Sequence, residues 1–100
     1  MDVVIASAKS IQPGKLMAVV KGDTQMLVAN VDGKYYAIGN VCTHMGCLLS
    51  DGILKGEKVV CICHGSTFDL KTGAVVHGPA KNTEPSYPLK VEGEQILADL

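Results

Sequence analysis

Short runs of β-prone residues alternate with glycine-containing turns along most of this 100-residue chain. The runs are rich in Val, Ile, Leu, Met, Thr and Tyr, and most of these residue types favour strands. No stretch repeats apolar residues at positions i, i+3, i+4 and i+7 over the length of a helix. The pattern therefore predicts an all-β fold, with strands at residues 15–20, 24–31, 34–41, 56–62, 66–70, 74–77, 86–91 and 94–100.

The sequences between these runs predict how the strands pair. Asp32-Gly33 between two β-prone runs is a strong short-range hairpin signal. Lys71-Thr72-Gly73 predicts a second hairpin, and Glu92-Gly93 predicts a third. Residues 78–88 hold three of the four prolines and are expected to form a semi-rigid loop.

Composition and charge restrict the class of protein. One hundred residues with no Trp and one Phe predict a single domain, residues 1–100, with a thin aliphatic core that an inorganic group would help to stabilise. The net charge of −1 and the lack of a basic block argue against nucleic acid or a membrane surface as a partner. No apolar run approaches the roughly 18 residues of a membrane span, and the first residues do not resemble a signal peptide. We therefore expect a soluble, cytoplasmic protein.

The cysteines and histidines are concentrated in two short stretches. Residues 42–47 read CTHMGC and residues 61–69 read CICHGSTFD, and together they contain all four cysteines and two of the three histidines. Each stretch follows a β-prone run and offers a thiolate and an imidazole, as two loops that close on one metal site would. The candidate ligands are Cys42, His44, Cys61 and His64. We assign no metal to the third histidine, His77.

Two metals suit this set of ligands. Two cysteines and two histidines could hold a structural zinc ion, or a [2Fe–2S] cluster in which two histidines replace two cysteines on one iron. Zinc motifs usually pair like ligands within a loop, whereas each loop here mixes Cys with His, as a dinuclear cluster requires. Two disulfides, a thiol hydrolase or ordinary core cysteines explain the pattern less well, because the histidines lie among the cysteines.

The two stretches resemble the motifs of the Rieske iron–sulfur proteins, C-x-H-x-G-C and C-x-C-H-G-S-x-[YF]-D. The later HGPA, residues 77–80, looks like the proline loop that covers the cluster in that family, and YYAIGNVCTH resembles its strand into the first loop. The resemblance covers residues 34–80. It implies an antiparallel β-sandwich with a small rubredoxin-like subdomain of two loops, at about residues 41–80, inserted in the β base domain.

The resemblance also implies a role for each residue of the site. Cys42 and Cys61 would hold the inner iron of one [2Fe–2S] cluster, and His44 and His64 the outer iron. Ser66 would donate its hydroxyl proton to a bridging sulfide, and Pro79 would lie in the covering loop. Gly46 and Gly65 would serve tight turns around the cluster. Cys47 and Cys63 match a pair that links the two loops by a disulfide in many members, and we expect that bond here.

The ligand charges predict the range of the reduction potential. Two ferric ions, two sulfides, two thiolates and two neutral imidazoles sum to zero, and a neutral site accepts an electron more readily than a dianionic one. The potential is then expected in the span of roughly −150 to +300 mV. Phe68 stands where high-potential members carry a Tyr that donates to a ligand sulfur. The missing donor favours an intermediate to low potential.

The function expected from these residues is one-electron transfer. No general acid–base pair, phosphate-binding loop or small-molecule substrate site is recognisable, so the chain is predicted to be a carrier and not an enzyme. It would pass electrons from a reductase to an oxygenase or another oxidoreductase. The alternatives are a permanent small subunit of a nitrite-reductase or arsenite-oxidase-like complex and, from a different class, a zinc-stabilised binding module.

Overall fold

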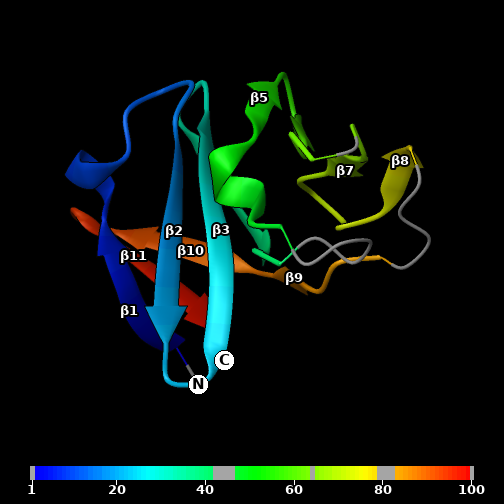
Figure 1. Ribbon diagram of the computed structural model, residues 1–100. Coiled ribbons are helices and arrows are strands. Elements are labelled where there is room, and N and C mark those ends of the chain that lie inside the picture. The colour runs from blue at the N-terminus through cyan, green and yellow to red at the C-terminus, as the bar shows by residue number, and fades with distance from the viewer. Residues whose placement is uncertain (1, 42–46, 64, 79–82, 100) are drawn as a thin grey trace.

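Antiparallel strands make up most of the computed structural model, which describes residues 2–41, 47–63, 65–78 and 83–99 (Figure 1). The strands are β1 (Asp2–Ser7), β2 (Leu16–Lys21), β3 (Thr24–Val31), β4 (Lys34–Gly39), β5 (Ile53–Lys55), β6 (Lys58–Val60), β7 (Thr67–Asp69), β8 (Val75–His77), β9 (Ser86–Tyr87), β10 (Leu89–Glu92) and β11 (Gln95–Asp99). Two short 3-10 helices, η1 (Ala8–Ser10) and η2 (Leu49–Asp51), interrupt them. The predicted all-β fold is confirmed.

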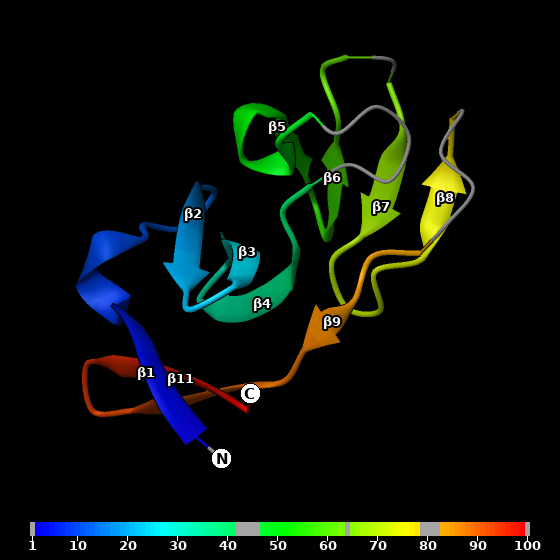
Figure 2. The same cartoon turned by 60° about the horizontal axis from the view of Figure 1, so that its bottom comes forward.

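The strands form three sheets. The terminal sheet has the order β1-β11-β10, the central sheet β2-β3-β4-β9, and the short-strand sheet β5-β6-β7-β8. All neighbouring strands within these sheets are antiparallel. Figure 2 shows the central sheet between the other two. Both faces of the central sheet are therefore covered, and both need apolar side chains.

Strand β3 supplies this double burial, because successive side chains of a strand point to opposite faces. One core cluster joins the central and terminal sheets and includes Met26, Val28, Ala37, Ile96 and Ala98. The other joins the central and short-strand sheets and includes Leu27, Ala29, Ile38, Val59 and Phe68. The apolar run MLVA in β3 is thus divided between two cores. This is why β3 reads as a continuous apolar run and not as an alternation.

The Asp32-Gly33 hairpin forms as predicted. Val31 pairs with Lys34, and both turn residues have a positive φ, 52° for Asp32 and 90° for Gly33. That combination defines a type I′ turn, whose twist matches that of the flanking strands. The buried Asn30 side chain accepts a hydrogen bond from the Gly33 N–H at 2.8 Å and so holds the turn from within.

Four differences from the predicted strands exceed one residue at a strand end. Strands β1 and β5 were not expected, and the predicted strand at 34–41 ends at Gly39. The predicted strand at 56–62 shortens to β6 because its cysteine end belongs to a turn. The run at 86–91 is broken at Pro88, which has no N–H to give to a ladder. Strand β9 before it pairs with β4 of the central sheet, and β10 after it pairs with β11 of the terminal sheet.

Among the described residues, no helix has both the length and the apolar character that a membrane span requires.

Candidate metal centre

Six of the predicted site residues are described by the structure: Cys47, Cys61, Cys63, Gly65, Ser66 and Phe68. The predicted ligands Cys42, His44 and His64, together with Gly46 and Pro79, lie outside the described residues. The structure therefore describes the segments that lead into the two loops, the second loop except His64, and the linkage between the loops.

Asn40 holds both ends of the first loop together. Its Oδ1 accepts a hydrogen bond from the Ser50 N–H at 2.8 Å, and its Nδ2 donates to Ser50 Oγ at 3.1 Å. Its carbonyl accepts from the Leu49 N–H at 2.7 Å. An antiparallel bridge between Val41 and Leu48 lies just inside these bonds. The sequence analysis missed Asn40, because its burial, which marks it as a polar anchor, appears only in the folded structure.

The second loop is closed by its own backbone. The N–H of Cys61 donates to the Ser66 carbonyl at 2.7 Å, and the N–H of Gly65 donates to the Cys61 carbonyl at 2.9 Å. Gly65 has a φ of 77°, which glycine adopts without strain. These bonds join the end of β6 to the start of β7, so the sheet itself sets the position of Cys61. Its side chain is 1% exposed.

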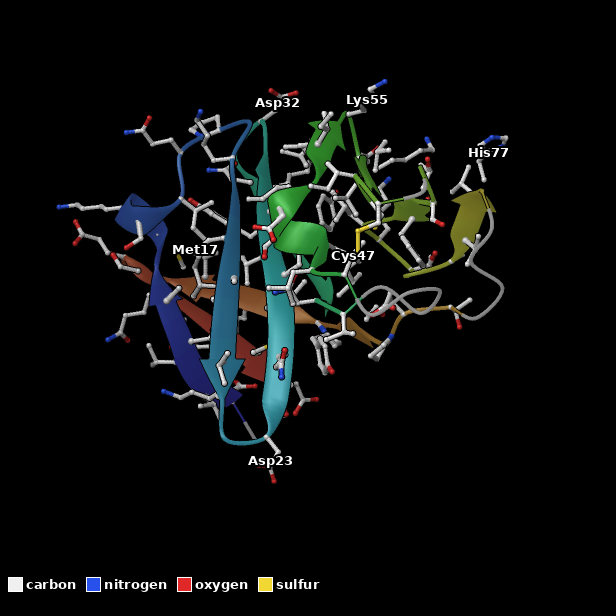
Figure 3. All side chains as sticks on the ribbon, viewed as in Figure 1. Met17, Asp23, Asp32, Cys47, Lys55 and His77 are labelled. Atoms are coloured by element: carbon white, nitrogen blue, oxygen red, sulfur yellow. A yellow bond between two sulfur atoms is a disulfide. The ribbon has the colours of Figure 1, made fainter. Side chains whose placement is uncertain are left out.

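A disulfide between Cys47 and Cys63 connects the two loops, with their Cα atoms 6.6 Å apart. Figure 3 shows this bond beside the labelled Cys47, between η2 and the short-strand sheet. The sulfurs of Cys47, Cys61 and Cys63 all lie within 4.8 Å of one another. A disulfide sulfur is not a thiolate, so Cys61 is the only one of these three that can bind a metal strongly. Whether this pair is oxidised in the isolated protein stays a prediction.

Ser66 and Phe68 line the buried side of the second loop. Both side chains are fully buried, and Phe68 pairs across the sheet with Val59 in the core. Gly78 lies against Ser66 so closely that a Cβ on this glycine would overlap the Ser66 Cα atom. Its φ of 102° also excludes most other residues. The segment that leads into residues 79–82 therefore approaches the second loop at backbone distance.

A polar contact lies at the other end of β6. The Tyr36 hydroxyl donates to Glu57 Oε2 at 3.0 Å, and Lys71 Nζ lies 2.9 Å from the same oxygen. The hydrogen bond from Lys71, and then that from Tyr36, lower the pKa of Glu57. Partial burial, followed by the hydrogen bond with Glu57, raises the pKa of Tyr36. Glu57 precedes β6 whereas Cys61 follows it, so this contact joins two sheets and takes no part in the metal centre.

A family model, the Rieske [2Fe-2S] domain, matches residues 1–88 of this sequence. The chain belongs to the Rieske [2Fe-2S] domain family. It is 33% identical over 90 residues to the ferredoxin component of a naphthalene 1,2-dioxygenase system from Pseudomonas aeruginosa, covering 90% of this chain and 86% of that protein.

Solved structures agree with this assignment. The fold matches that of the Sphingomonas yanoikuyae B1 ferredoxin with a TM-score of 0.93 and 30% identity, covering 100% of this chain and 99% of the other. It also matches a chain in a complex of reduced oxygenase and oxidised ferredoxin of carbazole 1,9a-dioxygenase, with a TM-score of 0.90, 26% identity, and coverage of 97% and 91%. The protein is thus a Rieske-type ferredoxin, an electron carrier and not itself a catalyst.

The described residues fit the [2Fe–2S] cluster that a Rieske domain carries. Cys61 offers a buried sulfur at the end of a strand, and the disulfide beside it brings the two loops together without using a ligand thiol. The burial of Cys61 limits access of water to its sulfur. Because the matching family model is that of a [2Fe-2S] domain, the zinc-stabilised module is set aside in favour of the Rieske centre.

Proposed function

We propose that Cys42, His44, Cys61 and His64 hold the cluster of this Rieske ferredoxin, with the cysteines on the inner iron and the histidines on the outer. The observation that carries this proposal is the position of Cys61, buried at the end of β6 and beside the Cys47–Cys63 link between the loops. That arrangement leaves two of the four cysteines for ligation. When bound, the cluster takes up and releases one electron at a time.

The neighbouring residues would tune and shield that centre. Ser66 is fully buried next to Cys61. This position suits a hydroxyl that donates to a bridging sulfide. Phe68 has no hydroxyl to give to a ligand sulfur, which supports an intermediate to low potential. Gly65 and Gly46 would allow the turns of the two loops, and Pro79 would cover the cluster. The close approach of Gly78 to Ser66 supports a covering role for the segment that follows it.

The partners we propose are an electron-donating reductase and an electron-accepting oxygenase. The relatives are ferredoxin components of dioxygenase systems, and one similar chain comes from a structure of an oxygenase–ferredoxin complex. Exposed apolar side chains flank both loops: Val41 and Leu48 at the ends of the first loop, and Ile62, 58% exposed, in the second. Such a surface suits the small, transient contacts of electron carriers.

We further propose that the chain acts in the cytoplasm as a single domain of residues 1–100, with a cluster-binding subdomain at about residues 41–80. The short-strand sheet, β5 to β8, lies wholly within that range and packs on the central sheet through its own core cluster. The Cys47–Cys63 disulfide would persist in a reducing compartment because the folded protein holds its two sulfurs together, which favours re-formation of the bond even though Cys63 is exposed.

The first test is the visible and EPR spectrum of the purified protein before and after dithionite, with iron and sulfide analysis. A Rieske centre gives a red-brown protein that bleaches on reduction and shows a rhombic signal with an average g below that of all-cysteine clusters. One zinc per chain and no EPR signal, in protein purified without loss of iron, would disprove the iron–sulfur cluster and favour the zinc-stabilised module.

The chain offers matched controls for each type of ligand. His44→Ala and His64→Ala should lose the cluster, whereas His77→Ala should keep it, because His77 is exposed and lies well away from the disulfide (Figure 3). In the same way, Cys61→Ser should lose the cluster while the Cys63→Ser variant retains it. Retention of a normal EPR signal by Cys61→Ser would contradict the proposed set.

The docking surface is tested by electron transfer to the oxygenase. Ile62→Glu should slow this transfer and leave the reduction potential unchanged, because it adds a charge to the contact and removes no ligand. Val20→Glu is the control, since Val20 is even more exposed, at 66%, but lies on β2 of the central sheet. Equal transfer rates for the two variants would contradict the proposed docking surface.

The alternative of a permanent subunit is tested by gel filtration of the native protein. Co-elution with an oxidoreductase would favour that alternative.

A further inference from the structure

Glu84 is the one charged residue whose side chain is buried among the described residues, with 4% of its surface exposed. Of the other glutamates, Glu57 is partly buried and Glu92 and Glu94 are exposed, and all three form ion pairs at the surface. Removing a carboxylate from water costs free energy that folding must recover elsewhere. A buried carboxylate in a small domain is therefore a candidate for a role other than stability.

Two glycines provide the space for Glu84. A Cβ on Gly39 would overlap Oε1 of Glu84, and a Cβ on Gly73 would overlap its carbonyl oxygen. The N–H of Glu84 donates to the Gly73 carbonyl at 2.8 Å, and the N–H of Gly39 donates to the Pro85 carbonyl at 2.8 Å. Glu84 is thus held between the last residue of β4 and the turn that joins β7 to β8.

This position places the carboxylate at the base of the first cluster loop. Oε1 lies against Gly39, and three residues of chain, at most about 11 Å, separate Gly39 from the proposed ligand Cys42. Gly73 lies in the turn between β7 and β8, at the end of the short-strand sheet opposite Cys61. The short route from Glu84 to a proposed ligand is therefore the one through Gly39 to Cys42.

We propose that Glu84 carries a buried negative charge that lowers the reduction potential of the cluster. With two thiolates and two neutral imidazoles, the oxidised cluster has no net charge and the reduced cluster has a charge of −1. A nearby anion raises the energy of the reduced form and leaves that of the oxidised form almost unchanged. For an assumed separation of about 12 Å and an effective dielectric constant of about 20, a unit charge changes the equilibrium constant for reduction about tenfold.

The test is a redox titration of the holoprotein followed by EPR, with Glu84→Gln compared with the wild type. The amide has nearly the shape of the carboxylate but no charge. The expected result is a potential raised by an amount equivalent to about tenfold in the equilibrium constant, about 59 mV for one electron. The increase should persist at high salt, because a buried charge is screened little.

Glu94→Gln is the matched control. Glu94 lies in the turn between β10 and β11 of the terminal sheet, and its ion pair with Lys9 is exposed. Its removal should leave the potential unchanged. The pair Glu84→Asp and Glu84→Asn repeats the comparison with two side chains that match in shape and differ in charge. The Asn variant should have the higher potential.

Two results would overturn the proposal. Equal potentials for the wild type and a folded, cluster-containing Glu84→Gln variant would show that Glu84 carries no charge that the cluster senses. A Gln variant that folds but binds no cluster would show that the carboxylate builds the site and does not set its potential. The inference rests on the proposed ligand set. An atypical wild-type EPR spectrum would indicate failure of that set, whereas an unshifted potential would indicate failure of the role of Glu84 alone.

Discussion

The disulfide between Cys47 and Cys63 should contribute measurably to the stability of this Rieske ferredoxin. The bond closes a loop with a sequence separation of 16 residues. In the chain-entropy model, a cross-link of that length destabilises the unfolded chain by about 3 kcal/mol at 25 °C. In a domain of about 100 residues, each kcal/mol changes Tm by roughly 4–8 °C, so the Cys47→Ala/Cys63→Ala variant should melt roughly 12–24 °C below the wild type.

Thermal unfolding should be followed by far-UV circular dichroism and by the visible absorbance of the cluster, with and without dithiothreitol. The reductant should lower the wild-type Tm toward that of the double variant, and it should not change the Tm of the variant itself. Titration of thiols in the unfolded wild type should find two fewer than its four cysteines supply once the cluster is removed. If the two proteins melt together whether or not dithiothreitol is present, the bond does not constrain the unfolded chain and the reasoning is wrong.

Three further changes test other parts of the structure. Phe68→Tyr should raise the reduction potential if its hydroxyl donates to a ligand sulfur, and potentiometry that finds no increase would count against the proposed reason for a low value. Gly78→Ala should lower the iron content per chain, because its Cβ would overlap the Ser66 backbone, whereas Gly93→Ala, with positive φ but open space around it, should lower Tm only and keep its iron. Because the pKa of Glu57 is lower in the folded state than its ordinary value of 4.5, its contribution to stability is complete above that value and is lost as pH falls through the folded pKa. A Tm series in that acidic range should therefore show a smaller decline for Glu57→Gln than for the wild type, and parallel declines would contradict the shift.

Several features of the fold could be predicted because their cause is local. Asp32-Gly33 specifies its hairpin through the backbone conformation of two residues, and the structure has the positive φ values that this turn type requires. The all-β class follows from the same kind of information, since the period of apolar residues is a property of a short window. The CTHMGC and CICHGSTFD stretches likewise carry the family in a few adjacent residues.

Other features depend on contacts between distant parts of the chain. Strand β1 pairs with β11, at the opposite end of the sequence, so no turn signal beside it announces the pairing. At Pro88 the chain passes from the central to the terminal sheet, which the apolar pattern of residues 86–91 does not reveal because both halves are β-prone. In β3, a single apolar run serves two cores only because another sheet covers each face.

The sequence by itself determined the fold class, the hairpin turns, the family and the residues available to bind a cluster, because each depends on the chemistry of neighbouring residues. Only the tertiary structure decided how those residues are supported. Asn40 reaches Ser50 across the first loop, and Glu84 fits between Gly39 and Gly73 because neither glycine has a side chain. The physical reason is that burial and close backbone approach are properties of packed sheets, and no single segment of the chain contains them.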